Sequence, residues 1–231
     1  LPALPLETDL AQSDKIGSGE VPALYPMGWG QVSNTPFPSF KTYTGGGGRR
    51  VCFIVSWPDQ ITDAGAIRTQ FAHVTDVMPT LLDLAGVTPL ARSHGEDALP
   101  MHGASLAQVM RGKAAHSVRS EQYYECWSNR AYWRDGWVAV SLQRKGDEID
   151  FDNWTLHEQA TDFSESVDVA AKHPERLREL VEAFDKAAWS NMVYPLDNRS
   201  AIQKFNQIPP HMRPPEKGSR RFLPGGQTVN R

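Results

Sequence analysis

Residues 50–57 read RVCFIVSW, an uninterrupted apolar run rich in β-branched residues that lies between glycines and Pro58. A half-buried strand would alternate apolar and polar residues, whereas a continuous run predicts a strand buried on both faces in the interior of an α/β sheet. Cys52 lies in this run, so we expect it to be a buried free thiol. Such a strand needs neighbours on both sides, and the chain supplies too few of them. The pattern therefore indicates a sheet that is completed by polypeptide outside this chain.

Two helices are expected to follow this run. The segment DVMPTLLDLAGV begins with Asp76, which can cap a helix, and Pro79 is tolerated in a first turn. Gly86 fits the end of that helix. Its expected buried face consists of Leu81, Leu82, Leu84 and Ala85. The later segment GASLAQVMRG predicts one more short helix.

After residue 120 the pattern changes to aromatic-rich, partly alternating segments. These read EQYYECW, RAYWRDGWVAVSLQ and NWTLHEQ, and the RDG in the second predicts a turn. Successive strands without intervening helices indicate a small antiparallel sheet. The next segment, HPERLRELVEAFDKAAW, predicts a helix with Pro174 and Glu175 in its first turn. One helical face carries Leu177, Leu180, Val181, Phe184 and Ala188, and this face can cover one side of the sheet.

These patterns divide the chain into three parts. Residues 1–118 are expected to belong to a larger α/β body, and residues 119–196 to a small α+β subdomain. The Pro-rich residues 197–231 are expected to form a linker.

Composition narrows the function classes. The chain has 231 residues, of which 40% are hydrophobic and 22% charged, so a core can form. The net charge is -3 and the pI is about 6.2. Neither value indicates the basic domain with clustered Lys and Arg that is typical of nucleic-acid-binding proteins. No apolar run approaches the roughly 20 residues that span a bilayer. We therefore expect neither a nucleic-acid partner nor a membrane span.

Lys41 is the first candidate for chemistry, because it shortly precedes four consecutive glycines at 45–48. Its ammonium could bind an oxyanion, and glycines let the backbone approach a ligand closely. The order differs from a phosphate-binding loop, in which the lysine follows the glycines. Pattern alone therefore favours a solvated lysine before a flexible turn.

Other polar and aromatic residues favour structural roles. The seven histidines show no zinc-binding spacing, and His73 reads as a structural histidine near a helix start. Tryptophans in the small sheet could form a sugar-binding platform, but core packing is the commoner use of such residues.

Four blocks, in this order, resemble the arylsulfatases, which are type I sulfatases of the alkaline phosphatase superfamily. The blocks are YPMGWGQVSNTPFPSFKTYTGGGGRRVCFIVSWP, QFAHVTDVMPTLLDLAGV, RDGWVAVSL and the segment from Asn153 to Trp189. The resemblance covers residues from about Tyr25 to Asp197. It implies an alkaline phosphatase-like sulfatase sheet followed by the small α+β subdomain.

The resemblance also implies an activity and a role for Lys41. Family members hydrolyse sulfate esters with a formylglycine nucleophile, made from the cysteine of a C-x-P-S-R-type motif. A divalent cation, usually calcium, polarises the sulfate. A lysine just ahead of the glycine turn is one of the groups that surround the sulfate, and Lys41 occupies that position. Lys41 is thus the expected catalytic and substrate-binding residue for a sulfate ester.

The departures from the family pattern are equally specific. Neither Cys52 nor Cys126 lies in the nucleophile motif, and the blocks that supply the metal ligands are absent. The usual T-H-E-G-G is T-G-G-G-G here, and Val138 stands where a lysine is common. We therefore expect a portion of an arylsulfatase that lacks N-terminal and C-terminal parts of the same protein and is inactive alone. The alternative is a non-catalytic, sulfatase-derived binding or interaction module.

Overall fold

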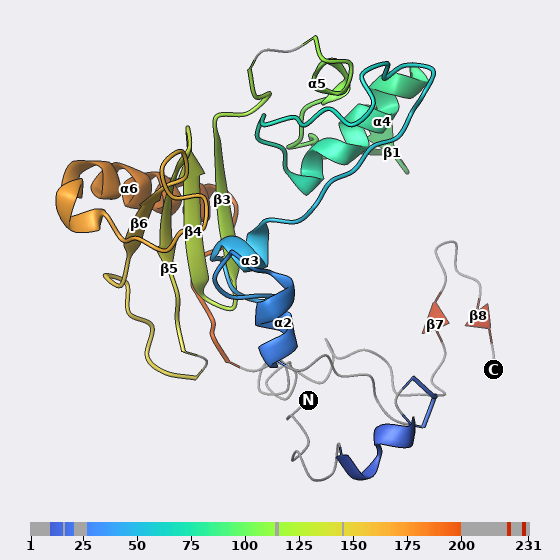
Figure 1. The fold of residues 1–231 in the computed structure, drawn as a ribbon. Coiled ribbons are helices and arrows are strands. Elements are labelled where there is room, and N and C mark those ends of the chain that lie inside the picture. Colours follow the sequence, from blue (N-terminus) through green and yellow to red (C-terminus); the bar gives the residue numbers. More distant parts are fainter. Residues whose placement is uncertain are drawn as a thin grey trace.

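A computed structural model describes residues 10–15, 17–20, 27–113, 116–144 and 146–199, together with the backbone of 221–222 and 228–229. Its centre is an antiparallel sheet in the order β3-β4-β5-β6 (Figure 1). The strands are β3 (Glu121–Cys126), β4 (Asn129–Arg134), β5 (Trp137–Ser141) and β6 (Thr155–Glu158). Asp135 and Gly136 have φ of 49° and 82° and make the tight turn between β4 and β5, as the RDG sequence predicts.

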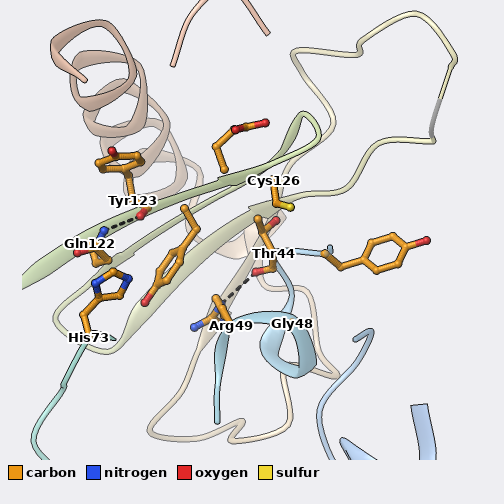
Figure 2. Close-up of a pocket in the computed structure, with 10 residues that line it drawn as sticks. Thr44, Gly48, Arg49, His73, Gln122, Tyr123 and Cys126 are labelled. Atoms are coloured by element: carbon orange, nitrogen blue, oxygen red, sulfur yellow. Dashed lines mark hydrogen bonds between the residues drawn. The ribbon is translucent and has the colours of Figure 1, made fainter. Parts of the chain in front are cut away.

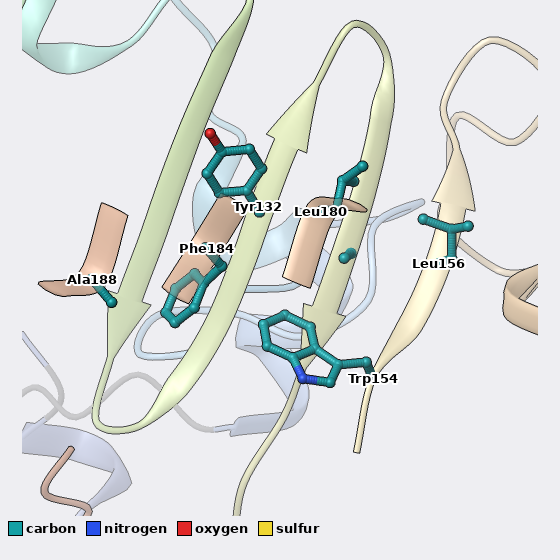
Figure 3. Close-up of a cluster of buried hydrophobic side chains, with 7 residues drawn as sticks. Tyr132, Trp154, Leu156, Leu180, Phe184 and Ala188 are labelled. Carbon is teal, nitrogen blue, oxygen red and sulfur yellow. The ribbon is translucent and has the colours of Figure 1, made fainter. Parts of the chain in front are cut away.

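One face of this sheet is covered by helix α6 (Pro174–Ser190). The strand register places Tyr132 opposite Ala139, and Ala139 opposite Leu156, so these side chains form one row. Leu180, Phe184 and Ala188 of α6 pack against this row and Trp154 (Figure 3). Leu177 and Val181 lie partly buried at the margin. The prediction of a small sheet with one covering helix is confirmed, including the face that the helix buries.

The opposite face of the sheet has its own apolar cluster. Ala131, Trp133, Val138 and Val140 are buried there. The ring of Phe71 stacks on that of Trp133 with 3.8 Å between centroids. The short helical turn α3 (Gly46–Arg49) and helix α2 (Met27–Ser33) also lie on this side of the sheet (Figure 1).

A lobe of short elements lies beyond the end of the sheet (Figure 1). It contains a 3-10 helix (Val74–Asp76), α4 (Val77–Ala85), the hairpin β1 (Arg92–Ser93) and β2 (Glu96–Asp97), and α5 (Ala107–Met110). Gly86 ends α4 with φ of 66°, as predicted. Asp76 is fully buried and accepts hydrogen bonds from the amides of His73 and Ala104 and from Arg119. This carboxylate therefore ties the start of α4 to the segment that enters β3.

The expected buried face of α4 is only partly correct. Leu81 is 57% exposed, Ala85 is also exposed, and Thr80 is the residue of the helix that is buried. Leu82 and Leu84 are half-buried, so the described residues cover only part of the predicted face.

The prediction of a buried strand over residues 50–57 is also wrong for the described chain. The segment belongs to no strand, and Val51 and Ile54 are 86% and 88% exposed. Cys52 is a free and exposed thiol, not a buried one. An apolar strand is buried on two faces only when other strands flank it, and no described residues pair with this segment.

Further short elements are described near the ends of the chain. A short 3-10 helix spans Ser13–Lys15, and β7 (Arg221–Phe222) pairs with β8 (Thr228–Val229). Most of the expected linker at 197–231 lies outside the described residues. Within the described part of the chain, none of the helices has the length and apolar character that a membrane crossing requires.

Candidate functional site

Lys41 lies in a turn whose backbone is strained on both sides. Ser39 has φ of 71° and Thr42 has φ of 81°. A positive φ is uncommon outside glycine, and for a β-branched residue such as threonine it is an outlier. Residues held in such conformations persist only where the surroundings fix them, and they cluster at functional sites. Lys41 itself is exposed.

The residues that follow Lys41 are fixed to the start of β4. The Thr44 hydroxyl is buried and donates to the backbone carbonyl of Arg130, with 2.9 Å between the oxygens. The Asn129 amide nitrogen lies 3.0 Å from the carbonyl oxygen of Thr42 and donates to it. Two neighbouring residues of β4 therefore hold the backbone of the Lys41 turn.

The glycines form a helical turn that packs closely against the same loop. The Gly47 amide donates to the carbonyl of Pro38 at 2.8 Å. A Cβ at Gly47 would lie 2.1 Å from the Ser39 carbonyl oxygen, and one at Gly48 would lie 1.9 Å from the Tyr43 carbonyl oxygen. These two positions therefore require glycine because of close backbone approach. This packing answers why glycines follow Lys41.

A buried ion pair anchors the glycine turn from its other end. The Arg49 guanidinium contacts the Glu165 carboxylate, and the side chains are only 4% and 1% exposed. Arg49 also donates to the Thr44 carbonyl at 3.1 Å. Next to it, the Arg50 guanidinium carbon lies 4.3 Å and 4.2 Å from the ring centroids of Phe37 and Phe163. The glycine turn is thus fixed to the sheet and to the loop after β6.

An open groove of about 380 Å³ lies between this turn and strand β3 (Figure 2). Its walls include Thr44, Arg49, His73, Gln122 and Tyr124. Burial, together with the charge of Arg119, lowers the pKa of His73. Burial raises the pKa of Tyr124 to about 12. Both side chains are therefore neutral near pH 7 and add no charge to the groove.

The residues singled out in the sequence lie in different environments. Lys41 forms no hydrogen bond or ion pair with the described residues. His73 is structural, as predicted, because its ring accepts the Thr75 amide at the start of a 3-10 helix. Trp133 and Trp154 are buried in the two core clusters, which confirms core packing. Val138 is fully buried, so a lysine there would have to place its charge inside the sheet.

The sequence alone did not predict three residues that hold the Lys41 turn. They are Asn129, Arg49 and Glu165. Arg49 directly follows the glycines, which was a usable signal for a partner of opposite charge. Glu165 lies 116 positions away in a polar loop, and nothing local marks it as buried. Asn129 lies 87 positions from Thr42, so their pairing depends on tertiary structure.

The described residues do not fit the cofactors that the resemblance implies. They bring together no group of three or more His, Cys, Asp or Glu side chains that could hold a metal ion. Calcium needs several oxygen ligands at one point, so no step is assigned to it on this chain. Neither Cys52 nor Cys126 forms a disulfide with a described residue, and neither lies in a formylglycine motif.

Comparisons with known proteins agree with this architecture. Residues 45–188 match the family described as N-sulphoglucosamine sulphohydrolase, C-terminal. An uncharacterized sulfatase of Schizosaccharomyces pombe is 28% identical over 160 residues, which are 68% of this chain and 28% of that protein. An arylsulfatase of Klebsiella aerogenes is 35% identical over 101 residues, which are 43% of this chain and 22% of that protein. The chain thus spans about a quarter of the length of these relatives.

A solved structure shows the same fold. The crystal structure of Ps i-CgsB in complex with k-i-k-neocarrahexaose superposes with a TM-score of 0.57 at 20% identity. The superposition covers 75% of this chain and 36% of that one. Together with the family match over more than half of the sequence, these findings show that the chain belongs to the sulfatase family described as N-sulphoglucosamine sulphohydrolase, C-terminal.

Proposed function

We propose that this chain is the part of an arylsulfatase that contributes Lys41 to the binding of the sulfate group during hydrolysis of a sulfate ester to an alcohol or phenol and sulfate. The observation that carries the proposal is the strained turn. Thr42 and Ser39 have positive φ on either side of an exposed lysine. Such conformations cost about 1–3 kcal/mol each and cluster at functional sites, which supports a functional role for this lysine.

The chemistry assigned to Lys41 is charge stabilisation. A lysine ammonium is a compact cation with three donors, and it interacts favourably with sulfate oxygens. Negative charge develops as the sulfur–oxygen bond of the ester breaks, and a fixed cation stabilises that charge more than it stabilises the ground state. The nucleophile and the calcium ligands would come from other parts of the enzyme, so this chain alone should not turn over substrate.

Two experiments test this role. The first grafts residues 25–197 into the matching region of the Klebsiella arylsulfatase and measures hydrolysis of an aryl sulfate with and without Lys41→Ala. Loss of one electrostatic donor should lower kcat by about 10²–10³-fold. A grafted enzyme that is equally active with alanine would overturn the proposal.

The second experiment uses the chain itself and does not depend on a folded graft. Lysine amines carrying ¹³C-methyl labels are followed by NMR as sodium sulfate replaces sodium chloride at constant ionic strength. We expect the Lys41 signal, assigned with Lys41→Arg, to respond at lower sulfate than the exposed Lys172 and Lys186. An equal response from all three lysines would contradict a sulfate site at Lys41.

The same chain also tests whether the nucleophile lies outside it. Aryl sulfate hydrolysis by the isolated chain in the presence of calcium, abolished by Cys52→Ala or Cys126→Ala, would place the nucleophile inside this chain. That result would overturn the proposed division of the site.

A further inference from the structure

The Asn129 side chain is the direct link between the sheet and the residue that follows Lys41. It is only 4% exposed and begins β4, immediately after Trp127 and Ser128, whose φ values are 54° and 66°. Its amide nitrogen donates to the carbonyls of Thr42 and Cys126, each at 3.0 Å.

The Asn129 amide oxygen is used as well. It accepts the Gln143 amide at 2.8 Å. Both donors and the acceptor of this side chain are therefore engaged. The three partners come from three separate segments, so the amide cannot rotate without losing a buried hydrogen bond.

Thr42 needs such a partner because its own conformation is unfavourable. With φ of 81°, this residue would relax toward negative φ if nothing held its peptide group. Relaxation would turn the Thr42 carbonyl away from Asn129 and change the direction in which the preceding Cα–Cβ bond leaves the backbone. The lysine side chain has four flexible methylenes, so its backbone is what gives the ammonium a defined position.

We propose that Asn129 is a positioning residue for Lys41: its buried amide holds Thr42 in a strained conformation and thereby aims the lysine. The inference rests on the proposed function of Lys41 as a sulfate-binding group. Asn129 acts through the backbone and does not contact the sulfate.

The test compares Asn129→Ala with Asn191→Ala. Asn191 also donates a hydrogen bond from its side chain to a backbone carbonyl, that of Ala187 at 2.8 Å, but it lies at the end of α6 and away from the turn. A second variant, Asn129→Asp, retains the acceptor for Gln143 and removes both donors. This second variant replaces Asn129→Ala in the test if the alanine variant does not fold.

Two readouts are recorded on the full chain. The first is the geometry of the turn: the ³J coupling of Thr42 and the hydrogen-exchange protection of the Gly47 amide, which donates to Pro38. The second is the sulfate concentration at which the labelled Lys41 amine responds. The amide of Ala139, in the fully buried centre of the sheet, reports global stability in the same samples.

We expect the Asn129 variants to lower Gly47 protection at least tenfold relative to Ala139, to shift the Thr42 coupling, and to raise the half-saturating sulfate concentration about tenfold. Asn191→Ala should leave all three unchanged. Unchanged Thr42 and Gly47 signals in a folded Asn129 variant would overturn the positioning role. A relaxed turn with unchanged sulfate response would overturn it as well. Failure of wild-type Lys41 to respond to sulfate would refute the proposed function, and the Thr42 and Gly47 signals would still decide whether Asn129 holds the turn.

Discussion

Arg49 and Glu165 form a nearly completely buried ion pair that joins the glycine turn to the loop following β6. The same Glu165 oxygen accepts a hydrogen bond from Gln159 at 3.0 Å, and Gln159 in turn accepts one from the Trp133 indole at 2.9 Å. This chain of contacts runs from the sheet to Thr44, whose carbonyl Arg49 also contacts. The candidate site is therefore a surface turn that carries Lys41, and the buried Arg49–Glu165 ion pair connects this turn to the sheet.

Replacing one member of this pair should be severely destabilising. Glu165→Ala leaves the Arg49 guanidinium buried without a counter-charge, and such changes lower the free energy of unfolding by about 3–5 kcal/mol. Urea unfolding followed by circular dichroism measures this loss. The control is Glu179→Ala, which removes an ion pair between Glu179 and Arg176. The Glu179 side chain is 54% exposed. Exposed pairs contribute about 0–1 kcal/mol, so equal effects in the two variants would contradict a structural role for the buried pair.

The glycine turn predicts a contrast between two glycine substitutions. Gly47→Ala would place a Cβ 2.1 Å from the Ser39 carbonyl oxygen, so the Lys41 loop must move. A Cβ added at Gly28 in α2 would have no atom within 4 Å, so Gly28→Ala meets open space. Helix propensity alone makes that second change favourable by about 0.5–1 kcal/mol. Thermal unfolding should show a lower Tm for Gly47→Ala and no decrease for Gly28→Ala; tolerance of alanine at 47 would refute the close packing.

Asp162 predicts a pH-dependent contribution to stability. Burial opposes its ionisation, but hydrogen bonds from the amides of Val167 and Ser166 and from the hydroxyls of Ser164 and Ser166 outweigh it and lower the pKa of the carboxyl to about 2. An unfolded aspartate has a pKa of about 3.9. Because the folded-state pKa is the lower one, the stabilisation is fully present above about pH 4 and is lost as the pH falls through about 2.

The measurement compares wild type with Asp162→Asn by urea unfolding between pH 7 and pH 2.5. Asparagine does not titrate, so the wild-type advantage in unfolding free energy should be constant at neutral pH and shrink below about pH 4. An advantage that stays constant across the whole range would show that the charge of Asp162 is not what stabilises the loop.

Prediction from sequence succeeded where a segment's partners are close along the chain. The helix at Pro174–Ser190 and the turn at Asp135 and Gly136 follow from periodicity and local turn chemistry. The Lys41 position came from resemblance to the arylsulfatases and stays a proposal. The Arg49–Glu165 pair was not predictable, because no periodicity relates residues 116 positions apart.

The failures have one physical cause. Residues 50–57 and Leu81 of α4 belong to apolar patterns that predict burial, yet most of the run and Leu81 are exposed. Burial, however, depends on what covers a segment, and no described residues cover Val51, Ile54 or Leu81. An apolar pattern therefore shows that a segment can be buried, but it does not show which residues, if any, cover it.

That exposed run gives a prediction of its own. Val51, Phe53 and Ile54 are 86%, 55% and 88% exposed, and an unpaired, apolar, β-branched segment is a template for pairing with another strand. We expect the purified chain to bind a hydrophobic dye such as ANS and to associate as its concentration rises. The double variant Val51→Lys with Ile54→Lys should reduce both effects, because charge on an edge strand opposes pairing. The control replaces Leu90 and Leu99, which are 75% and 91% exposed outside this run, with lysine. Dye fluorescence and light scattering that fall equally in both double variants would mean that general surface hydrophobicity, and not the strand-forming run at 51–54, drives association.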